Sequence, residues 1–359
     1  MNRSENFFLP DFSHVYLESA AKKYELTNLC LDQFSNSKVV EIPDYKTVFN
    51  RPGQDFQTQK RSMKLILAVK KPPYIYKGTN MLQDGGFRNF YYNTPILNCL
   101  YNCNYCFLQG MYPSANIVVF VNQEDMEKAV ESEIKIRPYQ NDPLMLSISY
   151  NTDLLAFENI LPMTRLWINY SKTQPDLNLE IRSKSTMFDP ISDIESTKKV
   201  LLAWTLSPEK VVNENELDTP PLIKRLKAVQ KAIRKGWRVR LCFDPIILYS
   251  GWEKDYLDFL NQIKSEISFN EIFDITVGVF RMGQDYFNRI RKTKPESKLY
   301  YQTYTNEAGV VTLSQSDREV VKVFIRENLS GFIPEDRIHF WDGLTDYKMK
   351  YFHRSKYGE

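Results

Sequence analysis

Hydrophobic and polar positions follow two alternating patterns from about residue 91 onward. Short apolar runs rich in β-branched residues are typical of buried strands, whereas longer stretches with apolar positions three and four apart indicate helices. We expect strands over 92–98, 116–121, 144–150, 178–183, 201–206, 239–243 and 274–280, and helices over 123–136, 156–172, 190–199, 220–235 and 252–267. This alternation predicts βα units around a parallel sheet. Six or so units favour an incomplete barrel over a doubly wound sheet, although periodicity alone is compatible with both.

The helix over 220–235 has the clearest signals at its ends. Thr219 suits the N-cap, Pro220 suits the first helical position, and Gly236 follows the last turn. Outside the repeating region, we expect a strand over 65–69, a hairpin that turns at 306–309, and a helix over 316–328. These patterns divide the chain into an N-terminal segment (1–90), an α/β barrel (91–280) and a C-terminal segment with a basic stretch, hairpin and helix (281–359).

Composition and charge are those of an ordinary globular protein. Hydrophobic residues make up 43% of the chain, and 47 Lys and Arg nearly balance 44 Asp and Glu, so a nucleic-acid surface would have to be local. The N-terminus lacks the apolar core of a signal peptide. The chain also has no apolar run of the roughly 18–20 residues that span a bilayer. We therefore expect a cytoplasmic protein with no membrane partner.

Three of the five cysteines lie within eight residues, as Cys99-x3-Cys103-x2-Cys106. Such a cluster is not typical of a disulfide framework and indicates metal binding. Three thiolates on one loop can bind three irons of a [4Fe–4S] cubane, which leaves the fourth iron open to the amino and carboxylate groups of S-adenosylmethionine (SAM). The loop also follows the first strand of the barrel, and the carboxyl ends of parallel strands are where functional groups collect.

Zinc is the main alternative for these cysteines. A structural zinc site has four protein ligands, and the only histidines are His14, His339 and His353. None of them has a spacing that supports a site with three cysteines. In this alternative the chain would be a zinc-stabilised nucleic-acid-binding module. The other two cysteines, Cys30 and Cys242, are interpreted as ordinary buried residues.

The cysteine motif and its setting resemble a known family. Cys-x3-Cys-x2-Cys is the radical SAM signature, and CNYCFLQGMYPSANIVVFVN (103–122) is similar to the matching segment of the spore photoproduct lyase family. The segments DFQTQKRSMKLILAVKK (55–71) and PLIKRLKAVQKAIRKGWRVRLCFDPIILYSGWEKDY (221–256) also resemble that family. The resemblance implies a partial (β/α)6 barrel with a C-terminal hairpin near DNA. It further implies a [4Fe–4S] cluster, SAM, and an electron donor such as flavodoxin or ferredoxin.

The family's activity is the reversal of a methylene-bridged thymine dimer by a 5′-deoxyadenosyl radical. Its cofactor contacts can be carried over individually. By this resemblance Thr152 lies beside the nucleoside, Lys184 pairs with the methionine carboxylate, and Thr205 makes a further polar contact. Asp244 stands where the family has an alanine near the adenosine.

Two positions depart from the family. Tyr150 replaces the cysteine that donates hydrogen, and Phe107 replaces the tyrosine that follows the third cluster cysteine; Tyr105 is retained. Phe107 has no O–H to give. Either Tyr150 takes over as donor, with Tyr105 as a second relay residue, or the radical acts on a modified nucleotide, RNA or a small molecule.

The stretch 281–298 carries six basic residues against two acidic ones. This excess is weak evidence for a surface that contacts the phosphates of DNA. Arg289, Arg291 and Lys292 are the candidate contacts.

Overall fold

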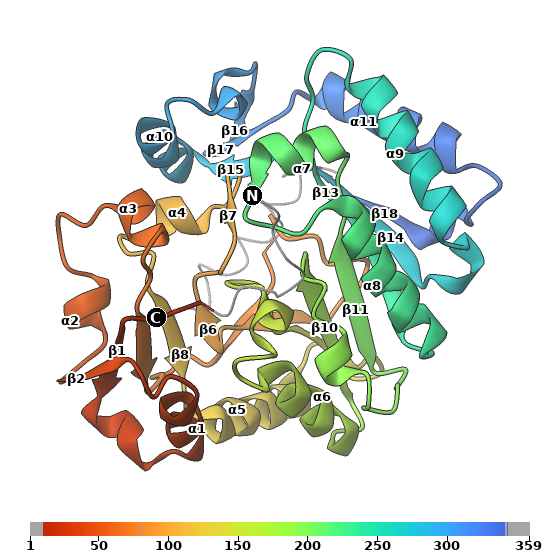
Figure 1. The fold of residues 1–359 in the computed structure, drawn as a ribbon. Coiled ribbons are helices and arrows are strands. Elements are labelled where there is room, and N and C mark those ends of the chain that lie inside the picture. Colours follow the sequence, from red (N-terminus) through yellow and green to blue (C-terminus); the bar gives the residue numbers. More distant parts are fainter. Residues whose placement is uncertain (1–9, 80, 342, 344–359) are drawn as a thin grey trace.

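The structure is a computed structural model that describes residues 10–79, 81–341 and 343. Its largest feature is a curled sheet that forms an open half-barrel (Figure 1). Across the described residues its order is β18-β14-β13-β11-β10-β9-β5-β4, and all neighbours are parallel except β4 and β5. The strands are β4 (Ile75–Lys77), β5 (Phe90–Asn93), β9 (Leu144–Ser147), β10 (Leu177–Ser183), β11 (Val200–Thr205), β13 (Arg238–Ile246), β14 (Asp274–Val279) and β18 (Ile338–Phe340). The expected partial barrel is confirmed.

Amphipathic helices cover the outer face of the half-barrel, as Figure 1 shows. They are α5 (Gln123–Ile136), α6 (Met163–Thr173), α8 (Leu222–Arg234), α9 (Trp252–Glu266) and α11 (Gln315–Leu329). Their apolar faces bury residues such as Trp167, Leu226 and Leu260 against the sheet. Within the described ranges, no helix combines the length and apolar character needed to cross a membrane.

A second, smaller sheet contains the early strands of the chain, in the order β2-β1-β3-β8-β6. These are β1 (His14–Glu18), β2 (Lys38–Ile42), β3 (Leu65–Ala68), β6 (Ile96–Leu97) and β8 (Ile117–Phe120). The strand expected over 116–121 is therefore β8, and it pairs with β3 instead of joining the barrel. The run 92–98 divides at Pro95 into β5 and β6, which belong to different sheets. The division of the chain into three domains stays a prediction.

Short elements and the C-terminal region complete the chain. The remaining short helices and strands before the C-terminal region are α1 (Glu25–Gln33), α2 (Lys46–Phe49), α3 (Phe56–Lys60), β7 (Asn102–Cys103), α4 (Leu108–Met111), α7 (Glu209–Asn215) and β12 (Glu216–Leu217). The C-terminal region contributes β15 (Arg281–Gly283), α10 (Gln284–Thr293), β16 (Thr305–Glu307) and β17 (Val310–Thr312). The hairpin expected at 306–309 is confirmed, with Ala308 and Gly309 at positive φ in its turn.

Three helix predictions need correction. The stretch 190–199 forms only a 3₁₀ turn (Asp189–Ile191), because its Ser, Asp and Thr side chains favour turns over helix. The stretch 156–172 divides at Pro162, and α6 begins directly after it. The helix expected from 220 begins at Leu222, and Thr219 is not its N-cap.

Candidate active site at the carboxyl end of the barrel

The three clustered cysteines lie on one loop between β6 and α4. Cys103 is buried, and Cys99 and Cys106 are partly exposed. The backbone N–H of Tyr101 donates to Cys99 Sγ at 3.4 Å, and Gln109 Nε2 donates to the Cys103 carbonyl at 2.7 Å. The loop is therefore held in place by bonds to its own backbone, with one sulfur already accepting a hydrogen bond.

Distant segments also anchor this loop. Cys103 in β7 pairs with Glu216 in β12. From the C-terminal segment, Lys294 donates to Asn104 Oδ1 at 3.0 Å, and the Tyr300 hydroxyl donates to the Asn104 carbonyl at 2.5 Å. The cysteine loop is thus fixed between the barrel and the region that follows it.

Burial and nearby lysines act in opposite directions on negative charge at the cysteine loop. Burial raises the pKa of the Cys99 and Cys103 thiols to about 12, so an unliganded thiolate is disfavoured there. The positive charges of Lys60, Lys184 and Lys294 all interact with one or more of the cysteine sulfurs. Three thiols on one anchored loop, surrounded by three lysines, fit a cluster that binds through thiolates and carries their negative charge.

A single-ion site receives less support. No three Cys, His, Asp or Glu side chains in the described part of the chain converge to hold one metal ion. His14 lies on β1 with its ring beside the Ser13 hydroxyl, and His339 lies on β18 at 3.5 Å from Asp274. His353, the third candidate for a zinc ligand, lies outside the described residues.

Tyr105 belongs to a buried polar cluster next to the cysteines. Its hydroxyl donates to Glu216, which also accepts from Ser207 at 2.9 Å and pairs with Arg225 at 2.5 Å. Burial opposes ionisation of Glu216, but Arg225 and Lys184 outweigh it and lower the pKa of the carboxyl. The Lys184 ammonium lies 5.3 Å from the centre of the Tyr105 ring. Tyr105 and Lys184, both predicted site residues, therefore lie together.

Lys184 follows β10, and Asp153 fixes its backbone. Asp153 accepts from the Lys184 N–H at 2.6 Å and from the Ser183 hydroxyl at 2.7 Å. The neighbouring Thr152 hydroxyl is buried and has no hydrogen-bond partner among the described residues. A buried hydroxyl without a partner is costly, and a bound ligand that supplies one removes the cost. Thr152 and Lys184 thus fit a polar cofactor at the barrel mouth.

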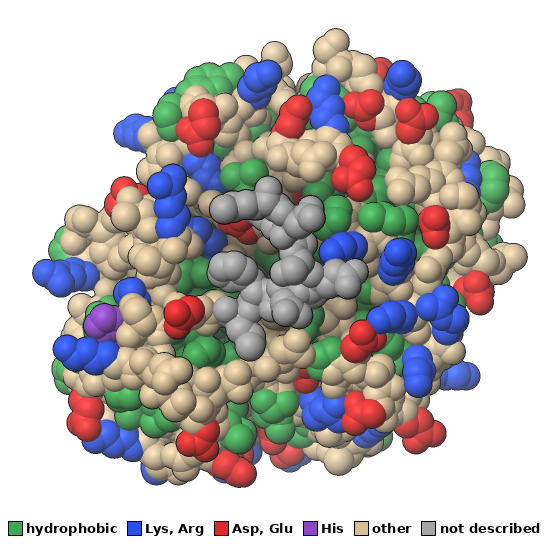
Figure 2. Space-filling model, viewed as in Figure 1, with side chains coloured by type: hydrophobic (Ala, Val, Ile, Leu, Met, Phe, Trp, Pro, Cys, Tyr) green, Lys and Arg blue, Asp and Glu red, His purple; other side chains and the backbone are tan. Residues whose placement is uncertain are grey.

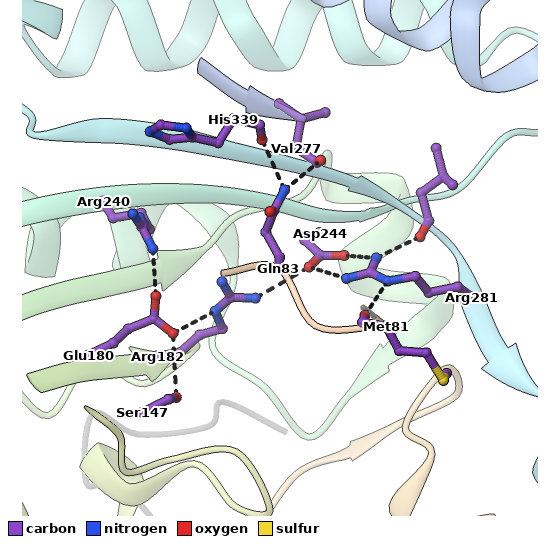
Figure 3. A network of polar contacts seen from close by, with 11 residues as sticks. Met81, Gln83, Ser147, Glu180, Arg182, Arg240, Asp244, Val277, Arg281 and His339 are labelled. Carbon is purple, nitrogen blue, oxygen red and sulfur yellow. Dashed lines mark hydrogen bonds and ion pairs between the residues drawn. The ribbon is translucent and has the colours of Figure 1, made fainter. Parts of the chain in front are cut away.

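Thr205 ends β11, and Asp244 lies near the end of the neighbouring strand β13. Thr205 closes β11 and is 2% exposed; its carbonyl accepts from Arg225 at 3.1 Å. The Asp244 carboxylate is held by Arg281 at 2.8 and 3.1 Å and by Arg182 at 3.3 Å (Figure 3). Arginines therefore already occupy both oxygens of Asp244, and its role toward a cofactor stays a prediction.

Tyr150 lies inside an aromatic group. Its ring centre is 4.7 Å from that of Tyr92 and 5.6 Å from that of Phe107. Burial raises the pKa of its hydroxyl, so the phenol stays protonated. The two positions that depart from the resembled family, Tyr150 and Phe107, are therefore direct neighbours.

Several residues of this region were not identified from the sequence. Glu216 and Arg225 form a fully buried ion pair, but nothing local in the sequence joins them to the cysteines. Glu180, Arg182 and Lys184 did carry a signal. They alternate along an otherwise apolar strand, so all three side chains share its inward face.

The basic stretch 281–298 differs from the expected surface. Lys294 is 2% exposed, and Arg281 pairs with Asp244 in the barrel. Arg289 is exposed but donates to the Gly110 carbonyl at 3.0 Å. Over the whole face of the molecule that Figure 2 shows, Lys and Arg side chains are mixed with acidic ones. Part of the basic excess therefore supports the structure instead of facing DNA.

Comparisons with known proteins agree on one family. A family model described as "Spore photoproduct lyase" matches residues 8–341. The spore photoproduct lyase of Bacillus subtilis (strain 168) is 23% identical, over 94% of this chain and 99% of the Bacillus chain. The protein of the same name from Geobacillus sp. (strain Y412MC61) is 21% identical, over 91% of this chain and 97% of its own.

Solved structures show the same fold. A spore photoproduct lyase double mutant with bound AdoMet and dinucleoside spore photoproduct superposes with a TM-score of 0.80. It is 18% identical and covers 92% of this chain and 98% of its own. A spore photoproduct lyase complexed with dinucleoside spore photoproduct gives a TM-score of 0.79 at 19% identity, over 92% and 99% of the two chains.

Proposed function

Because the chain belongs to the spore photoproduct lyase family, we propose that it is a radical SAM lyase that repairs the spore photoproduct in DNA. The observation that carries this proposal is the anchored loop of Cys99, Cys103 and Cys106 at the carboxyl end of a half-barrel. The comparisons give no support to RNA, a small molecule or a zinc-binding module. The proposal also includes a cytoplasmic location and an electron donor such as flavodoxin or ferredoxin.

In this proposal the three cysteines hold a [4Fe–4S] cluster and the barrel mouth holds SAM. When bound, the cluster supplies the electron that cleaves SAM to a 5′-deoxyadenosyl radical. Lys184 pairs with the methionine carboxylate, and the Thr152 hydroxyl gains the partner that it otherwise lacks. Thr205 and Asp244 line the same mouth.

Tyr150 acts on the substrate in this proposal. The O–H bond of the protonated phenol breaks, and its hydrogen atom is transferred to the substrate carbon radical. Tyr150 is left as a phenoxyl radical. Phe107 cannot take part in this transfer, because it has no hydroxyl. Tyr105, bonded to Glu216, lies on the cofactor side and is the second relay candidate.

Anaerobic purification tests the cofactor part of the proposal. We expect brown protein with about four iron atoms per chain, and release of 5′-deoxyadenosine when the reduced protein receives SAM. Cys103→Ala serves as the variant that lacks one ligand, and Cys242→Ala as a matched control in β13. Colourless protein with one zinc per chain would contradict the proposal.

A further inference from the structure

Six charged side chains cross the inside of the half-barrel in two connected groups, and Figure 3 labels all of them except Asp274. In the first group, Arg240 binds Glu180 at 2.7 Å and Asp274 at 2.6 Å. In the second, Asp244 binds Arg281 and Arg182. Arg182 also lies 3.7 Å from Glu180 and so joins the two groups.

The three arginines differ in how well their N–H groups are satisfied. Arg240 donates through Nε, Nη1 and Nη2 at 2.6 to 2.7 Å. Arg281 donates to Asp244 through two nitrogens, and its Nε donates to the Met81 carbonyl at 2.8 Å. Arg182 makes one long hydrogen bond, from Nη1 to Asp244 at 3.3 Å. Its Nε and Nη2 are buried and make no hydrogen bond in the described part of the chain. Nε faces Glu180 Oε1 in an ion pair at 3.7 Å, so Nη2 is the group left with no partner there.

Unsatisfied donors on a buried guanidinium are costly, and native structures keep few of them. Arg182 also lies close to the proposed site residues Lys184 and Tyr150. It is one strand repeat below Lys184 on the inward face of β10, and its charge interacts with the Tyr150 hydroxyl. The Arg182 guanidinium therefore lies near the residue that is proposed to act on the substrate.

The charge balance indicates which substrate group these donors suit. The three arginines face three carboxylates, Glu180, Asp244 and Asp274, so the network has no surplus positive charge. A bound phosphate would add a negative charge that the network does not compensate. A neutral carbonyl oxygen accepts hydrogen bonds from the same N–H groups and adds no charge. A thymine base carries two such carbonyl oxygens, and the one at C4 is adjacent to C5 of the ring.

We propose that Arg182 is a substrate-binding residue, and that its Nη2 group, which has no partner among the described residues, donates to a base carbonyl oxygen of the lesion beside Tyr150. The inference rests on the proposed function, because that function supplies the pyrimidine. The inference gives Arg182, a residue of a barrel strand that pairs with Asp244, a role in recognising the lesion.

The test measures binding of two ligands to the cluster-loaded protein by calorimetry. The first is the dinucleoside spore photoproduct, which has no linking phosphate, and the second is SAM. For Arg182→Met we expect the Kd of the lesion to rise about 10- to 100-fold, the range of a hydrogen bond to a charged group, with the Kd of SAM unchanged. Arg182→Lys keeps the charge and should lose less affinity. Arg88→Met, which removes an exposed arginine that pairs with Asp142 before β9, should match the wild type.

Each other outcome has a distinct meaning. An unchanged lesion Kd in both Arg182 variants would overturn the inference, as would an equal loss of SAM affinity. A loss seen only with the phosphodiester-linked photoproduct would overturn the carbonyl assignment in favour of phosphate. If Arg182→Met fails to fold, Arg182→Lys carries the test, with thermal unfolding to verify its fold. Failure of the wild type to bind either form of the lesion would instead contradict the proposed function.

Discussion

At the scale of single residues, the positions that depart from the resembled family lie within two groups of contacts. Tyr150 contacts Phe107, and Asp244 joins Arg182 and Arg281. By contrast, Lys184, Tyr105 and the three cysteines keep the family pattern. In the proposed function, the residues assigned to the cluster and to SAM are thus retained, whereas the residue assigned to hydrogen donation to the substrate and its neighbour Phe107 have both changed.

Tyr150→Phe tests the hydrogen donor. The variant loses the O–H bond and keeps the ring that packs on Tyr92, so we expect thymine formation to fall by about tenfold or more, with SAM cleavage retained. Chromatography of both products measures the two steps separately. Tyr170→Phe, which removes a hydroxyl bonded to the Glu127 carbonyl on the outer helices, is the matched control. Undiminished repair would exclude Tyr150 as donor.

Lys184→Met tests the cofactor carboxylate contact. Loss of a charge-assisted hydrogen bond should weaken SAM binding about 10- to 100-fold, measured by calorimetry. Lys231→Met removes an exposed lysine that pairs with Asp189 on the outside of the barrel and should leave the affinity unchanged. Equal SAM affinities for the two variants would remove Lys184 from the cofactor site.

At the scale of elements, close packing of strands holds the charged network in place. Gly278 in β14 leaves room for the Asp244–Arg281 pair, because a Cβ there would lie 2.5 Å from Asp244 Oδ1 and 2.7 Å from Arg281 Nη1. The carboxyl end of β14 therefore requires a residue without a side chain. The ion pair and the strand support each other.

Gly278→Ala should separate this ion pair and lower the free energy of unfolding by about 1–3 kcal/mol, the range for overpacking. Chemical denaturation measures the change. In Gly283→Ala the new Cβ would meet its nearest atom, on Tyr286, at 3.7 Å, so this control should be nearly neutral. Equal stability of both variants would show that the pair tolerates displacement.

The start of α6 makes stability depend on pH. Glu158 accepts from the backbone N–H groups of Thr164 and Arg165 at 2.8 and 3.1 Å, yet burial outweighs these bonds and raises the pKa of its carboxyl from 4.5 to about 7. Between these values the folded state binds more protons than the unfolded one. The contribution of Glu158 to stability therefore falls as pH rises from 4.5 to 7.

Glu158→Gln should remove this contribution, which amounts to at most about 3 kcal/mol across the window. Unfolding free energies at several pH values should thus fall less steeply for the variant than for the wild type. Glu253→Gln, at an exposed position on α9, should keep the wild-type slope. Parallel curves for Glu158→Gln and the wild type would contradict the raised pKa.

At the scale of the whole molecule, the sequence predicts local features well and long-range pairings poorly. Periodicity places α5 and the strands β9, β10, β11, β13 and β14 within a few residues, and cysteine spacing alone indicates the cluster loop. The edge strands β4 and β18 of the half-barrel were not predicted. Strand 117–120 shows the limit, since an apolar run does not reveal which sheet it joins. Glu216 and Arg225 were missed for a related reason. Their meeting with Tyr105 depends on chain segments more than 100 residues apart.

The most direct test of the account is repair itself. The reduced, cluster-loaded protein is incubated with SAM and DNA that contains the spore photoproduct, and restored thymine is measured over time beside the Cys103→Ala variant. We predict that thymine accumulates only when SAM is present, and that Cys103→Ala restores none. Formation of 5′-deoxyadenosine without any restored thymine would contradict the account, because the radical would then be made for a different substrate.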